Sequence, residues 1–125
     1  MRQLRFTNDH EWAQLDGNTV TIGITNFAQD QLGDLVFVEL PAVGNVVAQG
    51  DEAAVIESVK AAADVKAPVS GTVIEINKLL IDEPEKVNSD PMGDGWFYKL
   101  DVTNSTEWDS LMDETAYKAL VADAS

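Results

Sequence analysis

Short β-patterned runs separated by turn residues fill the first hundred residues, and they constrain the fold more than any other feature. Val20, Ile22 and Ile24 alternate with other residues, which is the period of a half-buried strand. A nearly continuous apolar run at 35–40 ends at Pro41. The other runs of this kind lie at 43–47, 53–57, 65–69, 72–76 and 96–102. Strands that recur about every 8–12 residues predict a mostly β sandwich or barrel rather than a parallel α/β sheet.

Two segments have helical patterns. Residues 26–32 suit one or two helical turns, and Gly33 follows them as a typical helix-ending residue. Thr106 and Asp109 have the spacing of a capping box. Apolar or small residues then recur at steps of three and four, at Trp108, Leu111, Met112, Thr115, Ala119 and Leu120. We therefore expect one amphipathic C-terminal helix over about 106–121, laid on the sheets.

The 125 residues indicate one domain, 1–125, with a β core over about 6–102 and the helix after it. Residues 77–88 are loosely patterned, and Leu79, Leu80 and Ile81 are their candidates to pack against the sheets. A chain of this length can bury about two-thirds of the surface that its unfolded form exposes, so we expect a sizeable core.

Composition excludes several classes of function. With no cysteine and one histidine, the chain has no disulfides, no thiolate chemistry and no multi-histidine metal centre, and we expect no metal site. The net charge of −14 comes from 22 acidic and 8 basic residues. Without a basic patch to offset it, this charge disfavours binding to nucleic acid or to anionic membranes. No apolar run approaches the roughly 18 residues that cross a bilayer.

Lys60 is the main candidate for chemistry. It follows Glu57, Ser58 and Val59 and precedes Ala61, at the expected bend between two strands. A lysine amine can be acylated. A hairpin tip would give an attaching enzyme access and give the modified side chain room to move. A solvated turn lysine is the ordinary interpretation of such a residue, so its spacing alone does not decide its role.

A series of motifs runs in a fixed order through residues 6–120. They are Asp9-His10-Glu11-Trp12, Gly23-Ile24-Thr25, Leu32-Gly33-Asp34, the run from Val36 to Pro41, Val43-Gly44, the run from Glu57 to Ala61 with Asp64, the run from Ala67 to Gly71, and Gly95-Trp96. Together these motifs resemble the H-protein family of the glycine cleavage system. Each motif is weak alone, and their order and spacing are specific.

The resemblance implies a fold, a cofactor and partners. The fold is a barrel-sandwich hybrid of the lipoyl/biotinyl-carrier type: two antiparallel sheets with short helical segments and a C-terminal helix. The cofactor is lipoate in amide linkage to Lys60. The partners are a pyridoxal-phosphate glycine decarboxylase, a tetrahydrofolate-dependent aminomethyltransferase, a flavin-dependent dihydrolipoamide dehydrogenase and the lipoyl-attaching enzymes. The chain would carry an aminomethyl group between the first two enzymes and would catalyse no step itself.

The resemblance also implies a cleft for the loaded arm. Glu11 and Asp64 occupy the family's matching positions, and Asp9 lies at a nearby position where the family varies. Carboxylates at the mouth of an apolar cleft can hold a cationic amine by charge-assisted hydrogen bonds. Exclusion of water would slow the hydrolysis of the cargo. The alternative for Glu11 and Asp64 is that both are solvated surface carboxylates.

Other conspicuous residues have structural interpretations. His10 has no cysteine partner, and no motif places a serine beside it. We therefore expect a hydrogen-bonded structural histidine at the start of a strand. Trp12 and Trp96 are expected in the core, because large aromatic side chains dominate core packing.

Competing functions remain at this point. A biotinyl carrier typically has methionines beside its lysine, whereas Val59 and Ala61 flank Lys60. A lipoyl domain of a 2-oxoacid dehydrogenase normally leads into a linker and a catalytic domain. An H-like relay protein, which passes lipoyl groups to other proteins, needs the same lysine and fold, although Glu11 and Asp64 favour the glycine role. An enzyme would need a nucleophile with a base, or a metal, and an inert interaction module would not need the hairpin.

We expect a monomer in a bacterial cytoplasm, with a mature mitochondrial matrix form as the fallback. The first residues show neither the apolar stretch of a secretory signal nor the character of a transit peptide. Met92 departs from the tyrosine that the family often has there, which concerns contacts with partners more than the carrier role.

Overall fold

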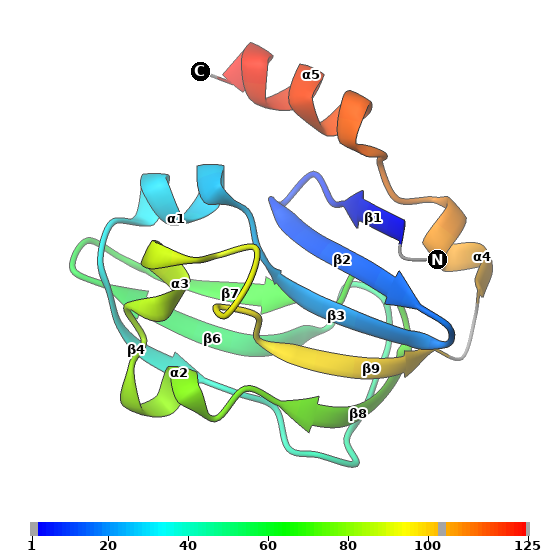
Figure 1. The fold of residues 1–125 in the computed structure, drawn as a ribbon, viewed down its shortest axis with the longest axis horizontal. Coiled ribbons are helices and arrows are strands. Elements are labelled where there is room, and N and C mark those ends of the chain that lie inside the picture. Colours follow the sequence, from blue (N-terminus) through cyan, green and yellow to red (C-terminus); the bar gives the residue numbers. More distant parts are fainter. Residues whose placement is uncertain (1–2, 103–104, 125) are drawn as a thin grey trace.

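The computed structural model describes residues 3–102 and 105–124. Its strands form a six-stranded sheet of order β1-β2-β3-β9-β8-β5 and a three-stranded sheet of order β4-β6-β7, with every pairing antiparallel (Figure 1). The strands are β1 (Gln3–Phe6), β2 (Glu11–Asp16), β3 (Thr19–Ile24), β4 (Leu35–Glu39), β5 (Val46–Val47), β6 (Glu52–Ser58), β7 (Ala62–Lys66), β8 (Gly71–Ile76) and β9 (Tyr98–Val102). The helices are α1 (Asn26–Leu32), α2 (Leu79–Asp82), α3 (Lys86–Ser89), α4 (Ser105–Asp109) and α5 (Glu114–Ala124). The prediction of a mostly β fold with two antiparallel sheets is confirmed.

The local patterns at β3 and α1 predicted both elements well. Val20, Ile22 and Ile24 all point into the core, as their alternation requires. Thr25 caps α1 because its hydroxyl accepts from the backbone N–H of Ala28 at 3.3 Å. Gly33 ends the helix with φ 79, a left-handed conformation that glycine adopts without strain.

The strand β4 is confirmed, but its apolar residues do not all face the core. Val36 is 56% exposed and Phe37 is 47% exposed, whereas Leu35 and Val38 are buried. The pairing with β6 shifts register between Leu35 and Phe37, as in a β-bulge. The continuous apolar run therefore indicated the strand correctly, and the structure shows that only part of it faces the core.

The second strand of the hairpin lies earlier than predicted. β7 begins at Ala62 and ends at Lys66, whereas the sequence predicted a strand over 65–69. The turn before β7 is tight, because Glu57 already pairs with Ala62. Pro68 and Val69 are buried without belonging to a strand, which explains why their apolar pattern was misleading.

The single C-terminal helix was a wrong prediction. The chain breaks between α4 and α5 because Met112 forms a β-bridge with Phe6 there: each residue's N–H donates to the other's carbonyl, at 2.8 and 2.9 Å. A backbone paired with a strand in this way cannot continue a helix. Thr106 lies inside α4, so it is not the N-cap of the predicted box. Trp108, Leu111 and Tyr117 are buried, whereas Thr115 and Ala119 are exposed.

The loosely patterned segment 77–88 forms two short helices, α2 and α3. Leu80 and Val87 are fully buried in the main core, whereas Ile81 is 59% exposed. Asn77 fixes the segment, because its side-chain amide donates to the carbonyls of Asp94 and Trp96 at 2.7 and 2.8 Å. Of the three predicted packing residues, Leu80 is therefore central and Ile81 is not.

The two tryptophans differ in burial. Trp12 is 2% exposed, its indole N–H donates to the carbonyl of Pro91 at 2.8 Å, and its ring lies against Gly23. A Cβ added at Gly23 would lie 2.7 Å from that ring, so this strand position has no room for a side chain. Trp96 is only partly buried, and the Lys99 amine lies 5.0 Å from the centroid of its ring. The core prediction is confirmed for Trp12 alone.

Adjacent residues of α2 give a matched stability test. Leu80→Ala should lower the free energy of unfolding by about 2–5 kcal/mol, because it leaves a cavity in the core. Ile81→Ala should change it by no more than about 0.5 kcal/mol, because that side chain is largely exposed. Urea denaturation of the two variants measures the difference, and equal losses would contradict this packing of α2.

Candidate functional site

Lys60 lies at the tip of the β6–β7 hairpin, in a turn that one side chain closes. Glu57 pairs with Ala62 at the last step of the ladder. The Ser58 hydroxyl accepts from the N–H groups of Lys60 and Ala61 at 3.1 and 3.0 Å, and it donates to the carbonyl of Ala61 at 3.1 Å. The turn is thus closed without any contribution from the Lys60 side chain, which is exposed.

The hairpin tip is also joined to the chain after α1. The N–H of Val59 donates to the carbonyl of Asp34 at 3.0 Å, although its side chain is 67% exposed. A Cβ added at Gly33 would lie 3.4 Å from Cε of Lys60, which shows how closely the lysine stem passes the end of α1. Gly33 therefore ends the helix and also leaves space for the stem.

A cleft of about 210 Å³ opens between α1, β7 and the start of β2. Its apolar lining comes mainly from Ile24, Phe27, Ala28, Leu32, Ile56, Ala63 and Val65. The three carboxylates predicted for a cleft, Asp9, Glu11 and Asp64, all line it. Leu32 is the last residue of α1 and precedes Gly33, so the Lys60 stem lies beside this cleft. The structure thus brings the predicted site residues together.

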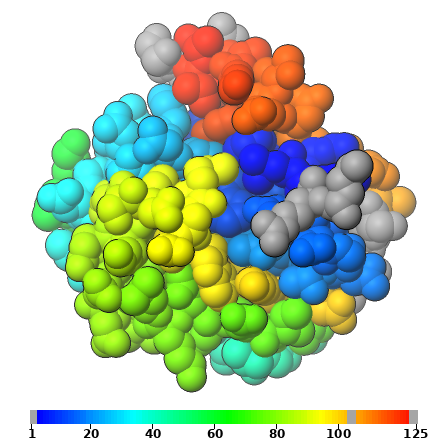
Figure 2. Space-filling model, viewed as in Figure 1, coloured from blue at the N-terminus to red at the C-terminus, as the bar shows by residue number. Residues whose placement is uncertain are grey.

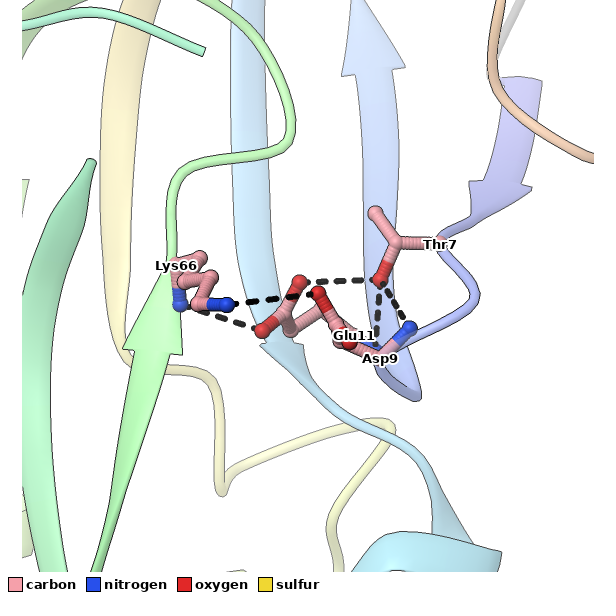
Figure 3. A network of polar contacts seen from close by, with 4 residues as sticks. All are labelled: Thr7, Asp9, Glu11 and Lys66. Carbon is pink, nitrogen blue, oxygen red and sulfur yellow. Dashed lines mark hydrogen bonds and ion pairs between the residues drawn. The ribbon is translucent and has the colours of Figure 1, made fainter. Parts of the chain in front are cut away.

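Glu11 is a buried carboxylate with a partner for each oxygen (Figure 3). The Thr7 hydroxyl donates to Oε1 at 2.8 Å, and the backbone N–H of Lys66 donates to Oε2 at 3.0 Å. The Thr7 oxygen in turn accepts from the N–H groups of Asp9 and Glu11, at 3.3 and 3.2 Å. Because Lys66 ends β7 and Glu11 begins β2, this side chain joins the two sheets.

Burial raises the pKa of Glu11 above its ordinary value of 4.5, because the charged form loses water. The hydrogen bonds from Lys66 and Thr7 oppose this effect, as does the charge of the Lys66 amine, and the nearby charge of Asp9 adds to it. Burial also raises the pKa of Tyr98, and the charge of Glu11 contributes. The Tyr98 hydroxyl has no hydrogen-bond partner among the described residues. Glu11 is therefore not a solvated surface carboxylate.

Asp9 and Asp64 have more open surroundings. Asp64 is exposed on β7, where it pairs with Val55. A carboxylate oxygen of Asp9 lies 3.9 Å from the Lys66 amine, and both side chains are about half exposed. Surface ion pairs of this kind contribute little to stability. Sequence reasoning missed Lys66, because only the fold shows that it lies next to the cleft carboxylates.

His10 is a structural residue, as predicted. It lies directly before β2, and its Nδ1 is 2.9 Å from the Tyr117 hydroxyl. Sequence reasoning missed Tyr117, whose only signal was a tyrosine within the helical pattern. Within residues 3–102 and 105–124, no three or more His, Cys, Asp or Glu residues are grouped to hold a metal. No helix in that part of the chain is long and apolar enough to cross a membrane.

Comparison with known proteins decides the family. The model of the family described as glycine cleavage H-protein matches residues 4–124. This chain belongs to the glycine cleavage H-protein family. The H protein of Parvibaculum lavamentivorans is 57% identical over 121 residues, which cover 97% of each chain. That of Bartonella quintana is 54% identical, over 97% of this chain and 99% of the relative.

A solved H protein has the same fold. The crystal structure of the glycine cleavage system H protein from Mycobacterium marinum matches with a TM-score of 0.85 and 35% identity, over 96% of this chain and 97% of that one. The predicted barrel-sandwich arrangement and the predicted family are confirmed. As a member of the H-protein family, the chain is a non-catalytic lipoyl carrier subunit of the glycine cleavage system.

The raised pKa of Glu11 predicts a pH dependence of stability. A carboxyl with a raised pKa stabilises the folded state below about its unfolded value of 4.5 and loses this contribution as the pH rises through its folded pKa. The stability of the wild type minus that of a Glu11→Gln variant should therefore fall with rising pH. Urea unfolding of both proteins between about pH 4 and 8 measures it. Thr7→Val removes a hydrogen bond that lowers the pKa of Glu11, so in that background the stability difference should fall at higher pH. A stability difference that rises with pH would show that the pKa of Glu11 is lowered instead.

Proposed function

We propose that Lys60 carries lipoate in amide linkage and that the arm conveys the aminomethyl group of glycine. The donor is the pyridoxal-phosphate glycine decarboxylase, the acceptor is the tetrahydrofolate-dependent aminomethyltransferase, and dihydrolipoamide dehydrogenase reoxidises the arm. Lipoyl-attaching enzymes act on Lys60 beforehand. The observation that carries this proposal is the exposed Lys60 amine on a rigid turn, next to an apolar cleft with three carboxylates.

The hairpin suits covalent attachment. Ser58 fixes the backbone of the turn, and the exposed amine remains free to react. When bound, the lipoyl group supplies a dithiolane whose sulfur accepts the aminomethyl group and later releases it. A short tether of this kind raises the effective concentration of its cargo to about the millimolar range at each site that it reaches.

The cleft suits a small cation. Glu11 is buried, and burial of its charge is unfavourable unless a positive group comes close. The cargo amine is cationic near neutral pH, so it would offset the cost of burying the Glu11 charge. The carboxylates of Asp64 and Asp9 at the rim would stabilise the same amine. Apolar side chains such as Phe27 and Leu32 would keep water from the labile carbon.

We also propose a bacterial cytoplasmic location and a monomeric state. The relatives from Parvibaculum lavamentivorans and Bartonella quintana, which are bacteria, support the first of these. A carrier that visits several enzymes in turn has to leave its hairpin accessible, which supports the second.

Attachment at Lys60 is tested by intact mass after expression with lipoate available. We expect a lipoyl increment on the Lys60 peptide and none in Lys60→Arg, which should also abolish glycine oxidation by the four-component system. Lys66→Arg is the matched control and should be lipoylated normally. A biotin increment, or undiminished glycine oxidation by Lys60→Arg, would contradict the proposal. A lipoylated protein that supports no glycine oxidation but donates lipoyl groups would indicate the relay role.

The role of the rim is tested with Asp64→Asn. Asn keeps an acceptor oxygen but loses the charge, and at this exposed position the change should speed the hydrolysis of the cargo from the loaded protein by about three- to ten-fold. Release of formaldehyde and ammonia at constant pH measures the rate. Asp82→Asn, on the exposed surface of α2, is the control and should match the wild type. Equal rates for the two variants would remove Asp64 from the proposed site.

A further inference from the structure

The Tyr117 hydroxyl of α5 joins two residues from the other end of the chain. It lies 2.9 Å from Nδ1 of His10 and 2.6 Å from Oγ1 of Thr25. The Tyr117 ring stacks on Phe6, with centroids 4.5 Å apart and planes at 9°. Figure 2 shows α5 seated above β1, with α1 next to it. One phenol thus connects the C-terminal helix to two separate segments.

The segment that begins at Thr25 forms one wall of the cleft. Thr25 caps α1, and the N–H of Ala28 has the Thr25 hydroxyl as its partner. The cap fixes where α1 begins and how it is directed. Phe27, Ala28 and Leu32 of this helix line the cleft. A group that holds the Thr25 hydroxyl therefore holds this wall.

The segment that contains His10 leads directly into Glu11. His10 has φ 68, a left-handed conformation that costs a residue other than glycine about 1–2 kcal/mol. Such a conformation persists only when its surroundings fix it. The carbonyl of His10 accepts from the N–H of Thr25 at 3.0 Å. The centroids of the His10 and Phe27 rings are 4.7 Å apart. His10 lines the cleft itself, so its position sets the entry of β2 and of Glu11.

We propose that the Tyr117 hydroxyl is a positioning group through which α5 holds both the α1 wall and the His10–Glu11 wall of the cleft around the cargo amine. This proposal rests on the proposed function of the cleft. The hydrogen bonds are consistent in either direction: Tyr117 can donate to His10 and accept from Thr25, or the reverse. In both cases, loss of the hydroxyl leaves Thr25 and His10 each without one partner. The C-terminal helix then no longer fixes the spacing of the two walls.

Tyr117→Phe isolates this effect, because it removes the hydroxyl and keeps the ring that stacks on Phe6. Tyr98→Phe is the matched control, since the Tyr98 hydroxyl is also buried but has no partner among the described residues. Glu107→Gln is the second control. Its carboxylate accepts from the N–H and hydroxyl of Ser70 at 2.7 and 2.9 Å, so the variant weakens the anchor of α4 without touching a residue that lines the cleft.

The first measurement uses the protein without lipoate. Amide hydrogen exchange at Ala28 reports the α1 cap directly, because that N–H bonds to the Thr25 hydroxyl. In Tyr117→Phe we expect exchange at Ala28 to become about three- to ten-fold faster, the loss expected for one hydrogen bond. Tyr98→Phe and Glu107→Gln should keep the wild-type rate at Ala28. The second measurement is hydrolysis of the cargo from the loaded proteins, which should accelerate by a similar factor in Tyr117→Phe alone.

Two results would overturn the proposal. The first is a wild-type exchange rate at Ala28 together with a wild-type rate of cargo hydrolysis in Tyr117→Phe. The second is a Glu107→Gln variant that loses as much melting temperature as Tyr117→Phe and shows the same increase in exchange at Ala28 and in cargo hydrolysis. That result would show general destabilisation. If the loaded wild type protects its cargo no better than a free dihydrolipoamide adduct, the proposed role of the cleft fails instead. The exchange measurement on the unmodified protein still decides whether Tyr117 fixes the α1 cap.

Discussion

The buried carboxylate of Glu11 joins the two sheets at the point where the cleft begins. Its oxygens accept from the hydroxyl of Thr7, directly after β1, and from the backbone N–H of Lys66 at the end of β7. A hydrophobic core sets the distance between two sheets, but it does not fix their alignment along the strands. A hydrogen bond from one sheet to a side chain of the other does fix it. The same side chain then presents a poorly solvated negative charge to the cleft, so alignment of the sheets and recognition of a cation depend on one group.

The acceptor lysine needs a mobile side chain, whereas the cleft needs a fixed shape. The hairpin backbone is rigid because the Ser58 hydroxyl bonds three times within the turn, while the Lys60 side chain is left unrestrained. The cleft is assembled from α1, β2 and β7, elements that are held by contacts distant in sequence. A carrier needs both, because the arm has to move between partners and the cargo has to remain protected in transit. The closeness of Gly33 to the Lys60 stem places the two parts side by side.

Sequence patterns predicted the elements whose signals are local and failed where tertiary contacts decided. β3 followed from alternation, α1 from a short helical pattern ended by a glycine, and the hairpin lysine from a recognisable motif. The C-terminal helix was predicted as one because nothing nearby shows that Met112 pairs with Phe6. Asp9, Glu11 and Asp64 were found through family resemblance, but the burial of Glu11 depends on an N–H 55 residues away. Tyr117 acts on His10 from a distance of 107 residues, beyond the reach of any local pattern.

The register shift in β4 also bears on self-association. β4 is an edge of the small sheet, and its exposed Val36 and Phe37 would favour the addition of a strand from another molecule. A bulge breaks the even spacing of free N–H and carbonyl groups that such an added strand would need. The net charge of −14 adds repulsion between copies. The irregular edge thus disfavours the addition of a strand from another molecule, although apolar side chains remain exposed beside the hairpin.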